Sequence, residues 1–165
     1  MNFKEKLHAI RCFVFDVDGV LTDGQLLITH EGQQLRSMNI KDGYALQLAI
    51  KQGYHVFIIS GAVSEGVVKR LNSLGIKEVF TGVPDKKAKL NELMHQHNLT
   101  SEQILYMGDD MPDLEVMQMV GIATCPADAI PQVKKISIYI SEKKGGEGCV
   151  RDVVEQVLTL HNKWT

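Results

Sequence analysis

The sequence has little of what marks several classes of protein. It holds only three cysteines, Cys12, Cys125 and Cys149, and no Cys-x-x-Cys pair. An odd number of widely spaced thiols disfavours both a disulfide framework and a cysteine-based zinc site. The same pattern is typical of proteins from a reducing compartment, so we expect a cytoplasmic location.

An excess of charge of one sign is also lacking. The 18 Lys and Arg residues nearly balance 20 Asp and Glu residues, for a formal net charge of −2. This balance gives no electrostatic reason to expect a nucleic-acid surface. No apolar run approaches the roughly 20 residues that span a bilayer, and residues 1–11 lack the apolar centre of a signal peptide. We therefore expect neither nucleic acid nor a membrane as a partner.

No repeat, low-complexity tract or linker interrupts the 165 residues, so we expect one domain over residues 1–165. Apolar runs of strand length alternate with helical patterns, which predicts parallel strands joined by right-handed crossovers. The fold class is α/β, with a Rossmann-like three-layer arrangement around a parallel sheet. The expected strands cover 10–15, 54–59, 78–80, 103–107, 121–124 and 136–140, and the expected helices cover 42–52, 64–74, 86–97, 112–119 and 151–160.

One segment breaks the alternation of strands and helices. Residues 25–38 contain two short strand-like runs around the turn at residues 30–32, which is the pattern of a β-hairpin. The segment directly follows an acid-rich loop that begins at Asp16. We therefore expect a small hairpin insertion after the first strand, projecting over the site that this loop forms.

Two clusters of carboxylates follow expected strands. Residues 16–19 come directly after the first strand, and Asp16 and Asp18 are spaced to lie on one side of an extended backbone. Residues 108–113 follow a later strand and contain three further aspartates. In open α/β sheets, ligands gather at the carboxyl ends of the strands. The two clusters are therefore expected to meet in one pocket.

Such a pocket requires compensation of its negative charge. Two like charges 4 Å apart cost roughly 4 kcal/mol at an effective dielectric of 20. Only a bound cation or raised pKa values make this tenable, and an all-oxygen site favours Mg²⁺. The alternative, solvated turn residues, is weakened because both clusters end strands. A calcium-binding EF-hand loop fits less well, since it needs glycine at its sixth position and Gly19 is fourth from Asp16.

Two further polar motifs lie between the acidic clusters. Ser60 and Gly61 follow the second strand and precede a helix, where a hydroxyl and backbone N–H groups can hold phosphate oxygens. Lys86 opens another helix. Taken alone, the first motif is more often an ordinary helix cap, and the alternative for Lys86 is a solvated surface lysine.

With these motifs in this order, the sequence resembles the haloacid dehalogenase superfamily of phosphatases. The resemblance rests on residues 16–23, then Ser60, then Lys86, then residues 108–113, and it spans most of the chain. It implies that Asp16 attacks phosphorus and forms a phosphoaspartate. It also implies that Asp18 protonates the leaving oxygen and then deprotonates the hydrolytic water.

The resemblance further implies a Mg²⁺ site and its surroundings. The ion would bind Asp16, the backbone carbonyl of Asp18 and Asp109. Asp110 and Asp113 would support it by holding its waters and Lys86.

The same resemblance implies the groups that contact the substrate. Ser60 and Lys86 would stabilise the phosphoryl oxygens. Thr22 and Gly61 are expected to bind the substrate as well.

Members of this superfamily usually carry a cap domain, and this sequence leaves no room for one. Only 37 positions separate Asp23 from Ser60 (60 − 23), and 26 separate Ser60 from Lys86 (86 − 60). Another element must exclude water from the site, and we expect a neighbouring subunit to do so.

The layout without a cap resembles the 3-deoxy-D-manno-octulosonate 8-phosphate phosphatase group, with local agreement at residues 22–24, 41–44 and 145–151. The resemblance implies a sugar-acid phosphate as substrate, a role in lipopolysaccharide precursor synthesis, and a homotetramer whose subunits complete each other's sites. It also implies that the glycine-rich tail, residues 145–151, can reach toward a neighbour's site. Lys41 would attract the substrate carboxylate or remain solvated. Ala62 and Glu147 stand where many relatives carry arginine.

Three alternatives remain at this point. Close relatives act on nine-carbon 2-keto-3-deoxy acid 9-phosphates. A phosphorylation-receiver domain also has an acidic pocket, but its lysine comes last in the chain, whereas Lys86 precedes the second acidic cluster. A non-catalytic oligomerisation module would be expected to have lost Asp16 or Asp18, and both are present.

Overall fold

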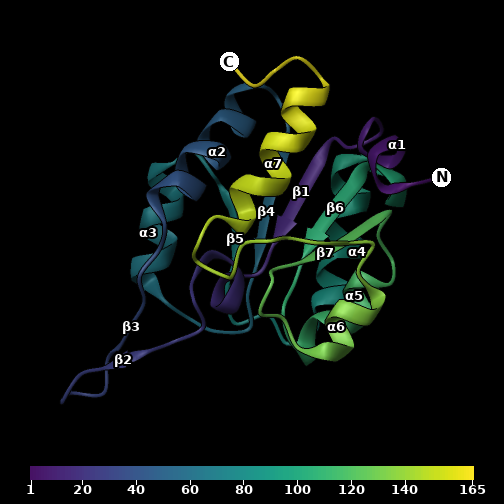
Figure 1. Ribbon diagram of the computed structural model, residues 1–165. Helices are drawn as coiled ribbons and strands as arrows, with labels where there is room; N and C mark the ends of the chain where they lie inside the picture. The colour runs from purple at the N-terminus through teal and green to yellow at the C-terminus, as the bar shows by residue number, and fades with distance from the viewer.

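The computed structural model describes residues 1–165 and is built around one six-stranded sheet (Figure 1). Every neighbouring pair of strands is parallel, and the strand order is β5-β4-β1-β6-β7-β8. The predicted α/β fold with a parallel sheet and no cap domain is confirmed. The strands are β1 Cys12–Phe15, β4 His55–Ile59, β5 Glu78–Phe80, β6 Ile104–Met107, β7 Ile122–Cys125 and β8 Tyr139–Ile140.

Helices cover both faces of the sheet and produce three layers. One apolar cluster joins the sheet to α2, α3 and α7, and a second joins it to α4, α5 and α6. The helix α6 was not predicted; it occupies the start of the segment expected to be a strand over 136–140 and leaves only two residues for β8. The helices are α1 Phe3–Leu7, α2 Ile40–Lys51, α3 Glu65–Ser73, α4 Lys86–His97, α5 Leu114–Met117, α6 Pro131–Ile136 and α7 Cys149–Leu160.

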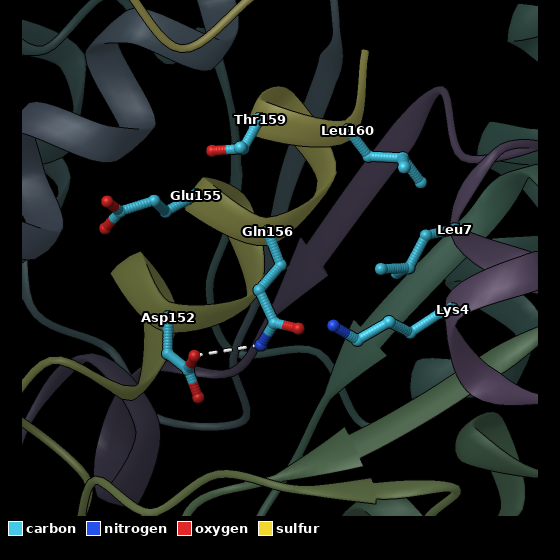
Figure 2. A pocket seen from close by; sticks show the side chains of 7 residues that line it. All are labelled: Lys4, Leu7, Asp152, Glu155, Gln156, Thr159 and Leu160. Carbon is cyan, nitrogen blue, oxygen red and sulfur yellow. Dashed lines mark hydrogen bonds between the residues drawn. The ribbon is translucent and has the colours of Figure 1, made fainter. Parts of the chain in front are cut away.

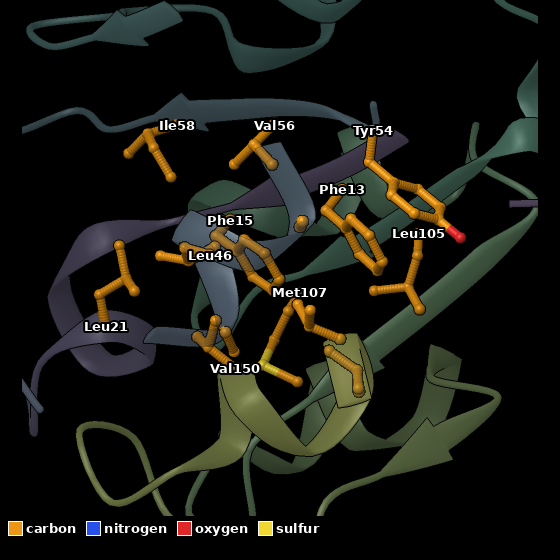
Figure 3. Close-up of a cluster of buried hydrophobic side chains, with 14 of the residues drawn as sticks. Phe13, Phe15, Leu21, Leu46, Tyr54, Val56, Ile58, Leu105, Met107 and Val150 are labelled. Atoms are coloured by element: carbon orange, nitrogen blue, oxygen red, sulfur yellow. The ribbon is translucent and has the colours of Figure 1, made fainter. Parts of the chain in front are cut away.

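Strand β1 shows how the sequence divides between the two layers. Phe13 and Phe15 point into the cluster drawn in Figure 3, whereas Cys12 and Val14 belong to the cluster on the opposite face. Side chains of a strand alternate between the faces of the sheet, so a run of four apolar residues buries both. Full burial of each phenylalanine contributes roughly 1.5–3 kcal/mol. The strand that carries the first acidic loop is therefore firmly anchored.

The segment expected to form a hairpin does so, and it extends away from the sheet (Figure 1). Strands β2 Leu27–Ile28 and β3 Gln34–Leu35 pair antiparallel and are only two residues long each. Leu27 and Ile28 are 68% and 57% exposed. An isolated two-stranded hairpin is marginally stable in water, so this one gains stability only where its apolar side chains are covered.

The glycine-rich tail lies against the first acidic loop of its own subunit, not away from the molecule. The Gly146 N–H donates to the Val20 carbonyl (3.0 Å), and the Asn39 side-chain amide donates to the Gly146 carbonyl (3.2 Å). A Cβ atom on Gly145 would collide with the carbonyl oxygens of Gly19 and Thr22. The tail backbone is thus packed onto the loop of its own subunit, and the expectation that it also reaches toward a neighbour's site stays a prediction.

Helix α7 begins directly after this tail, two residues earlier than predicted. Its N-cap residue Gly148 has no side chain to cap the first turn, and Asp42 of α2 does so in its place. The Asp42 carboxylate accepts a hydrogen bond from the Arg151 N–H (2.9 Å), and its other oxygen is buried without a partner. Burial raises the pKa of Asp42 to about 6. The cap fixes the start of α7 and, through it, the tail.

No helix combines the length and the apolar character needed to cross a bilayer.

Candidate active site

The first acidic loop leaves β1 and is held in shape by its own polar groups. The Asp16 carboxylate accepts a hydrogen bond from the Val17 N–H (2.7 Å). The Thr22 hydroxyl, which is fully buried, accepts from the N–H groups of Gly19 and Gly24 (both 3.2 Å). Buried polar groups of this kind fix a loop because leaving any of them unpaired is costly. Asp16 and Asp18 thus project from a braced turn.

The second acidic loop leaves β6 and is organised around Asp113, which is fully buried. One of its oxygens accepts hydrogen bonds from the N–H groups of Asp109 (3.0 Å) and Asp110 (3.4 Å). The other accepts from the Lys86 ammonium (2.9 Å) and the Tyr106 hydroxyl (2.7 Å). Both oxygens of Asp113 are therefore engaged, which fits its expected supporting role beside Lys86.

The two loops meet because β1 and β6 are adjacent in the sheet. Phe15 pairs with Met107 at the ends of the strands, so the following residues emerge side by side. One carboxylate oxygen from each of Asp16, Asp109 and Asp113 lies within 4.8 Å of the others. Lys86, at the start of α4, reaches this cluster with its ammonium 3.2 Å from Asp16.

One lysine does not balance the three carboxylates. Burial, followed by the charge of Asp113, raises the pKa of Asp16 to about 7. Burial, followed by the charge of Asp16, raises the pKa of Asp109 to about 8. Both shifts reflect ionised forms that the protein alone stabilises poorly. A cation placed among these groups would favour the ionised forms.

The residues present fit Mg²⁺. The Asp109 Oδ1 atom is buried and has no hydrogen-bond partner. Asp16, Asp109 and the backbone carbonyl of Asp18 offer the hard oxygen ligands that this ion prefers, and it usually completes its shell with waters. Asp113, whose oxygens are both engaged, would orient neighbours and not bind the ion.

Gly19 allows Asp109 to approach the first loop. Its φ is +86°, and a Cβ atom there would overlap the Asp109 carboxylate. We expect Gly19→Ala to lower turnover by at least about 100-fold and to weaken Mg²⁺ binding, because it displaces a proposed ligand. Steady-state kinetics and a Mg²⁺ titration of the thermal midpoint would measure both effects.

Gly32, at the hairpin tip, provides a matched control. Its φ is also +86°, but a Cβ atom there meets nothing within 4 Å. Both substitutions bear the backbone strain of roughly 1–2 kcal/mol, and only Gly19→Ala disturbs Asp109. Equal activities of the two variants would contradict the assignment of Asp109 to the metal site.

A cavity of about 360 Å³ opens above the carboxylates. Ser60, which is 2% exposed, lies at the end of β4, and its hydroxyl accepts from the Ala62 N–H (3.2 Å). Gly61 and Ala62 also line this cavity. The cavity therefore combines carboxylates, a hydroxyl and an ammonium at the carboxyl edge of the sheet. This combination suits a phosphate ester bound beside a divalent ion.

Two of the expected substrate contacts lie elsewhere. Thr22 is fully buried and does not line the cavity, because its hydroxyl is used to brace the loop. Lys41 is exposed on the first turn of α2 and borders a different groove, together with Glu142 and Glu147. Neither side chain reaches the site within its own subunit.

Arg36 also belongs to the site and was not predicted from the sequence. Its guanidinium pairs with both oxygens of Asp18, at 2.6 Å and 3.1 Å. Eighteen positions separate the two residues, and no local spacing rule links them. Only the expectation that the hairpin covers the site pointed toward such a contact.

Another cavity, between α1 and α7, is lined by seven residues (Figure 2). One of its two acidic residues, Asp152, accepts hydrogen bonds from Gln156 on one oxygen and from the hydroxyls of Tyr139 and Ser141 on the other. These bonds occupy the carboxylate. The cavity shares no residue with the acidic cluster, which remains the candidate active site.

Comparisons with known proteins identify the family to which the chain belongs. Residues 72–151 match the haloacid dehalogenase-like hydrolase family. The 3-deoxy-D-manno-octulosonate 8-phosphate phosphatase of Yersinia pestis is 36% identical over 93% of this chain and 82% of its own length. The enzyme of the same name from Escherichia coli K12 is 34% identical over 96% of this chain and 84% of its own length.

A solved structure extends the likeness to three dimensions. The 3-deoxy-D-manno-octulosonate 8-phosphate phosphatase of Moraxella catarrhalis, in complex with a magnesium ion, a phosphate ion and a KDO molecule, has a TM-score of 0.93, with 34% identity over 98% of this chain and 92% of that one. The resemblance drawn from the motifs is confirmed. The chain belongs to the 3-deoxy-D-manno-octulosonate 8-phosphate phosphatase family of haloacid dehalogenase-like hydrolases.

Proposed function

We propose that this protein is a Mg²⁺-dependent phosphatase that hydrolyses 3-deoxy-D-manno-octulosonate 8-phosphate to the free sugar acid and phosphate. The proposal rests above all on the meeting of Asp109 with the buried Asp16 and Lys86 at the carboxyl edge of the sheet, in a chain of this family. The reaction would serve lipopolysaccharide precursor synthesis in the cytoplasm, and the single domain of residues 1–165 would supply the reacting groups.

The geometry supports a two-step reaction. Asp16 attacks phosphorus, a bond forms between its carboxylate and the phosphoryl group, and the bond to the sugar oxygen breaks. Asp18, beside the cavity, gives the leaving oxygen its proton. Asp18 then takes a proton from the water that hydrolyses the phosphoaspartate, which returns both carboxylates to their initial state.

The remaining groups hold the phosphoryl oxygens and the nucleophile. The Lys86 ammonium and the Val17 N–H both contact Asp16 Oδ1, so this carboxylate has little freedom to rotate. Ser60 and the backbone at Gly61 line the cavity where phosphoryl oxygens would lie. Asp16, Asp109 and the Asp18 carbonyl would hold Mg²⁺, which neutralises charge on the transferring group.

The hairpin supports a homotetramer in which subunits complete each other's sites. Leu27, Ile28 and Leu35 are all exposed on a short hairpin that projects from the sheet. Clustered exposed apolar side chains of this kind mark a surface that is covered in the working protein. With no cap domain, a neighbouring subunit is the element that would exclude water from the cavity.

A phosphate-release assay tests the substrate. We expect the specificity constant to be at least about tenfold higher for the eight-carbon acid 8-phosphate than for hexose phosphates and nucleotides. A nine-carbon keto-acid 9-phosphate is the necessary comparison, because the uncharged Ala62 lines the cavity where many relatives carry arginine. Preference for the nine-carbon ester would change the proposed substrate but not the proposed type of reaction. Equal specificity constants for all esters would refute the proposal that the substrate is an acidic sugar phosphate.

A further inference from the structure

Arg36 makes an ion pair with the proposed acid/base residue that the mechanism above does not use. Its Nε and Nη2 atoms donate to the two oxygens of Asp18, at 2.6 Å and 3.1 Å. The pair is partly buried, and the side chains come from different elements: Asp18 from the loop after β1, Arg36 from the residue after β3. Asp18 lines the catalytic cavity, whereas Arg36 lines the groove between the hairpin and α3.

The geometry of this pair restricts Asp18. A guanidinium that binds both oxygens of a carboxylate fixes its plane as well as its position, which a single ammonium cannot do. Asp18 has no other hydrogen-bond donor to its carboxylate in the structure, in contrast to Asp16 and Asp113, which are held by two or more. The orientation of Asp18 therefore depends on Arg36.

We propose that Arg36 is a positioning residue that aims the Asp18 carboxylate at the leaving oxygen of the substrate. The proposal rests on the phosphatase function proposed above and adds to it a role for the hairpin. Arg36 directly follows β3, so the position of the hairpin determines where the guanidinium lies. A neighbour that covers the hairpin would thereby also fix the group that transfers the proton.

An experiment must distinguish two roles for Arg36, positioning of Asp18 and binding of the substrate. A residue that aims Asp18 matters whenever the leaving group needs a proton. A residue that binds the carboxylate of the substrate matters only for acidic esters. Three esters distinguish these cases: the acidic sugar phosphate, a neutral hexose 6-phosphate, and p-nitrophenyl phosphate, whose nitrophenolate leaves without a proton.

The measured quantity is kcat/KM, which includes only the steps up to loss of the alcohol and so excludes hydrolysis of the phosphoaspartate. General acid catalysis typically contributes about 10²–10⁴-fold. We expect Arg36→Met to lower kcat/KM about 10- to 100-fold for both sugar phosphates and less than about threefold for p-nitrophenyl phosphate. Arg36→Lys is expected to recover part of the loss. Lys69→Met, in the same groove and of equal charge change, is expected to stay near wild type.

A double-mutant cycle with Asp18→Asn completes the test. If Arg36 acts through Asp18, Arg36→Met has no further effect on kcat/KM in the Asp18→Asn background. A loss confined to the acidic ester, or one that persists in that background, would overturn the proposal and assign Arg36 to substrate binding. An equal loss on all three esters would reduce Arg36 to a structural role. If the wild type released phosphate from none of them, the proposed function itself would fail.

Discussion

Asp16→Asn is expected to lower turnover by at least about 10⁴-fold while the fold is kept. Removing the covalent nucleophile of a well-studied protease costs about 10⁶-fold in kcat, which sets the scale. The asparagine side chain retains an oxygen that can accept from the Val17 N–H, as Asp16 does at 2.7 Å. Phosphate release measures the loss, and rapid acid quenching with labelled substrate tests for a phosphoenzyme, which only the wild type should form.

The same substitution has an expected effect on stability, and its sign follows from the raised pKa. Asp16 titrates near pH 7 in the folded protein, against about 3.8 for an ordinary aspartate. The folded state therefore binds the Asp16 proton more tightly than the unfolded state does. The stability of the wild type consequently falls as the pH rises from 3.8 to about 7. Without metal, the stability of Asp16→Asn relative to wild type should therefore increase as the pH is raised from 4 to 8.

A second aspartate of the same loop serves as the control. Asp23 does not line the cavity, and its carboxylate accepts only from the Gln25 N–H (2.9 Å). Asp23→Asn should keep near wild-type turnover and show no comparable change with pH. If Asp16→Asn kept more than a few per cent of wild-type turnover, the nucleophile would have been assigned wrongly.

Removal of divalent metal is expected to cause a loss of about 10³-fold or more, restored by Mg²⁺. A Lewis acid supplies several kcal/mol of transition-state stabilisation in sites of this kind. Binding should also raise the thermal midpoint, because an ion that binds only the folded state at 100 times its Kd adds about 2.7 kcal/mol. The raised pKa values of Asp16 and Asp109, caused first by burial and then by neighbouring carboxylates, point the same way, since the ion would favour the ionised forms of both groups.

Two comparisons make this result specific. Asp109→Asn should lose most of the Mg²⁺-dependent rise in thermal midpoint, because it removes a proposed ligand whose Oδ1 atom is otherwise without a partner. Sodium chloride at matched ionic strength should leave the wild-type midpoint nearly unchanged. Full activity in the presence of excess chelator would refute the metal-dependent mechanism.

The sheet and the meeting of the acidic loops could be predicted from the sequence because both follow from local patterns. Strand β1 is a continuous apolar run, and Asp16 follows its last residue. Once β1 and β6 are adjacent and parallel, the register between Phe15 and Met107 brings the next residues together. That Lys86 lies beside these loops could be predicted only from the family resemblance, because a lysine that opens a helix is usually solvated.

The parts that could not be predicted depend on contacts between distant segments. Helix α6 was missed because it is only six residues long, and of these only Ile136 fell within an expected element, the strand over 136–140. Thr22 was expected to bind substrate, since nothing local reveals that its hydroxyl accepts from Gly19 and Gly24. The hydrogen bonds that Arg36 donates to Asp18, and the cap that Asp42 provides for α7, join segments that only the topology brings together.

The packing of the tail onto the catalytic loop gives the molecule an internal reporter of local opening. Cys149, the first residue of α7, is fully buried, and its thiol donates to the Val20 carbonyl of that loop (3.3 Å). Burial raises the pKa of this thiol, so it is neutral and shielded from alkylating reagents while the tail is seated. The rate at which such a reagent labels Cys149 therefore measures how often the tail separates from the catalytic loop.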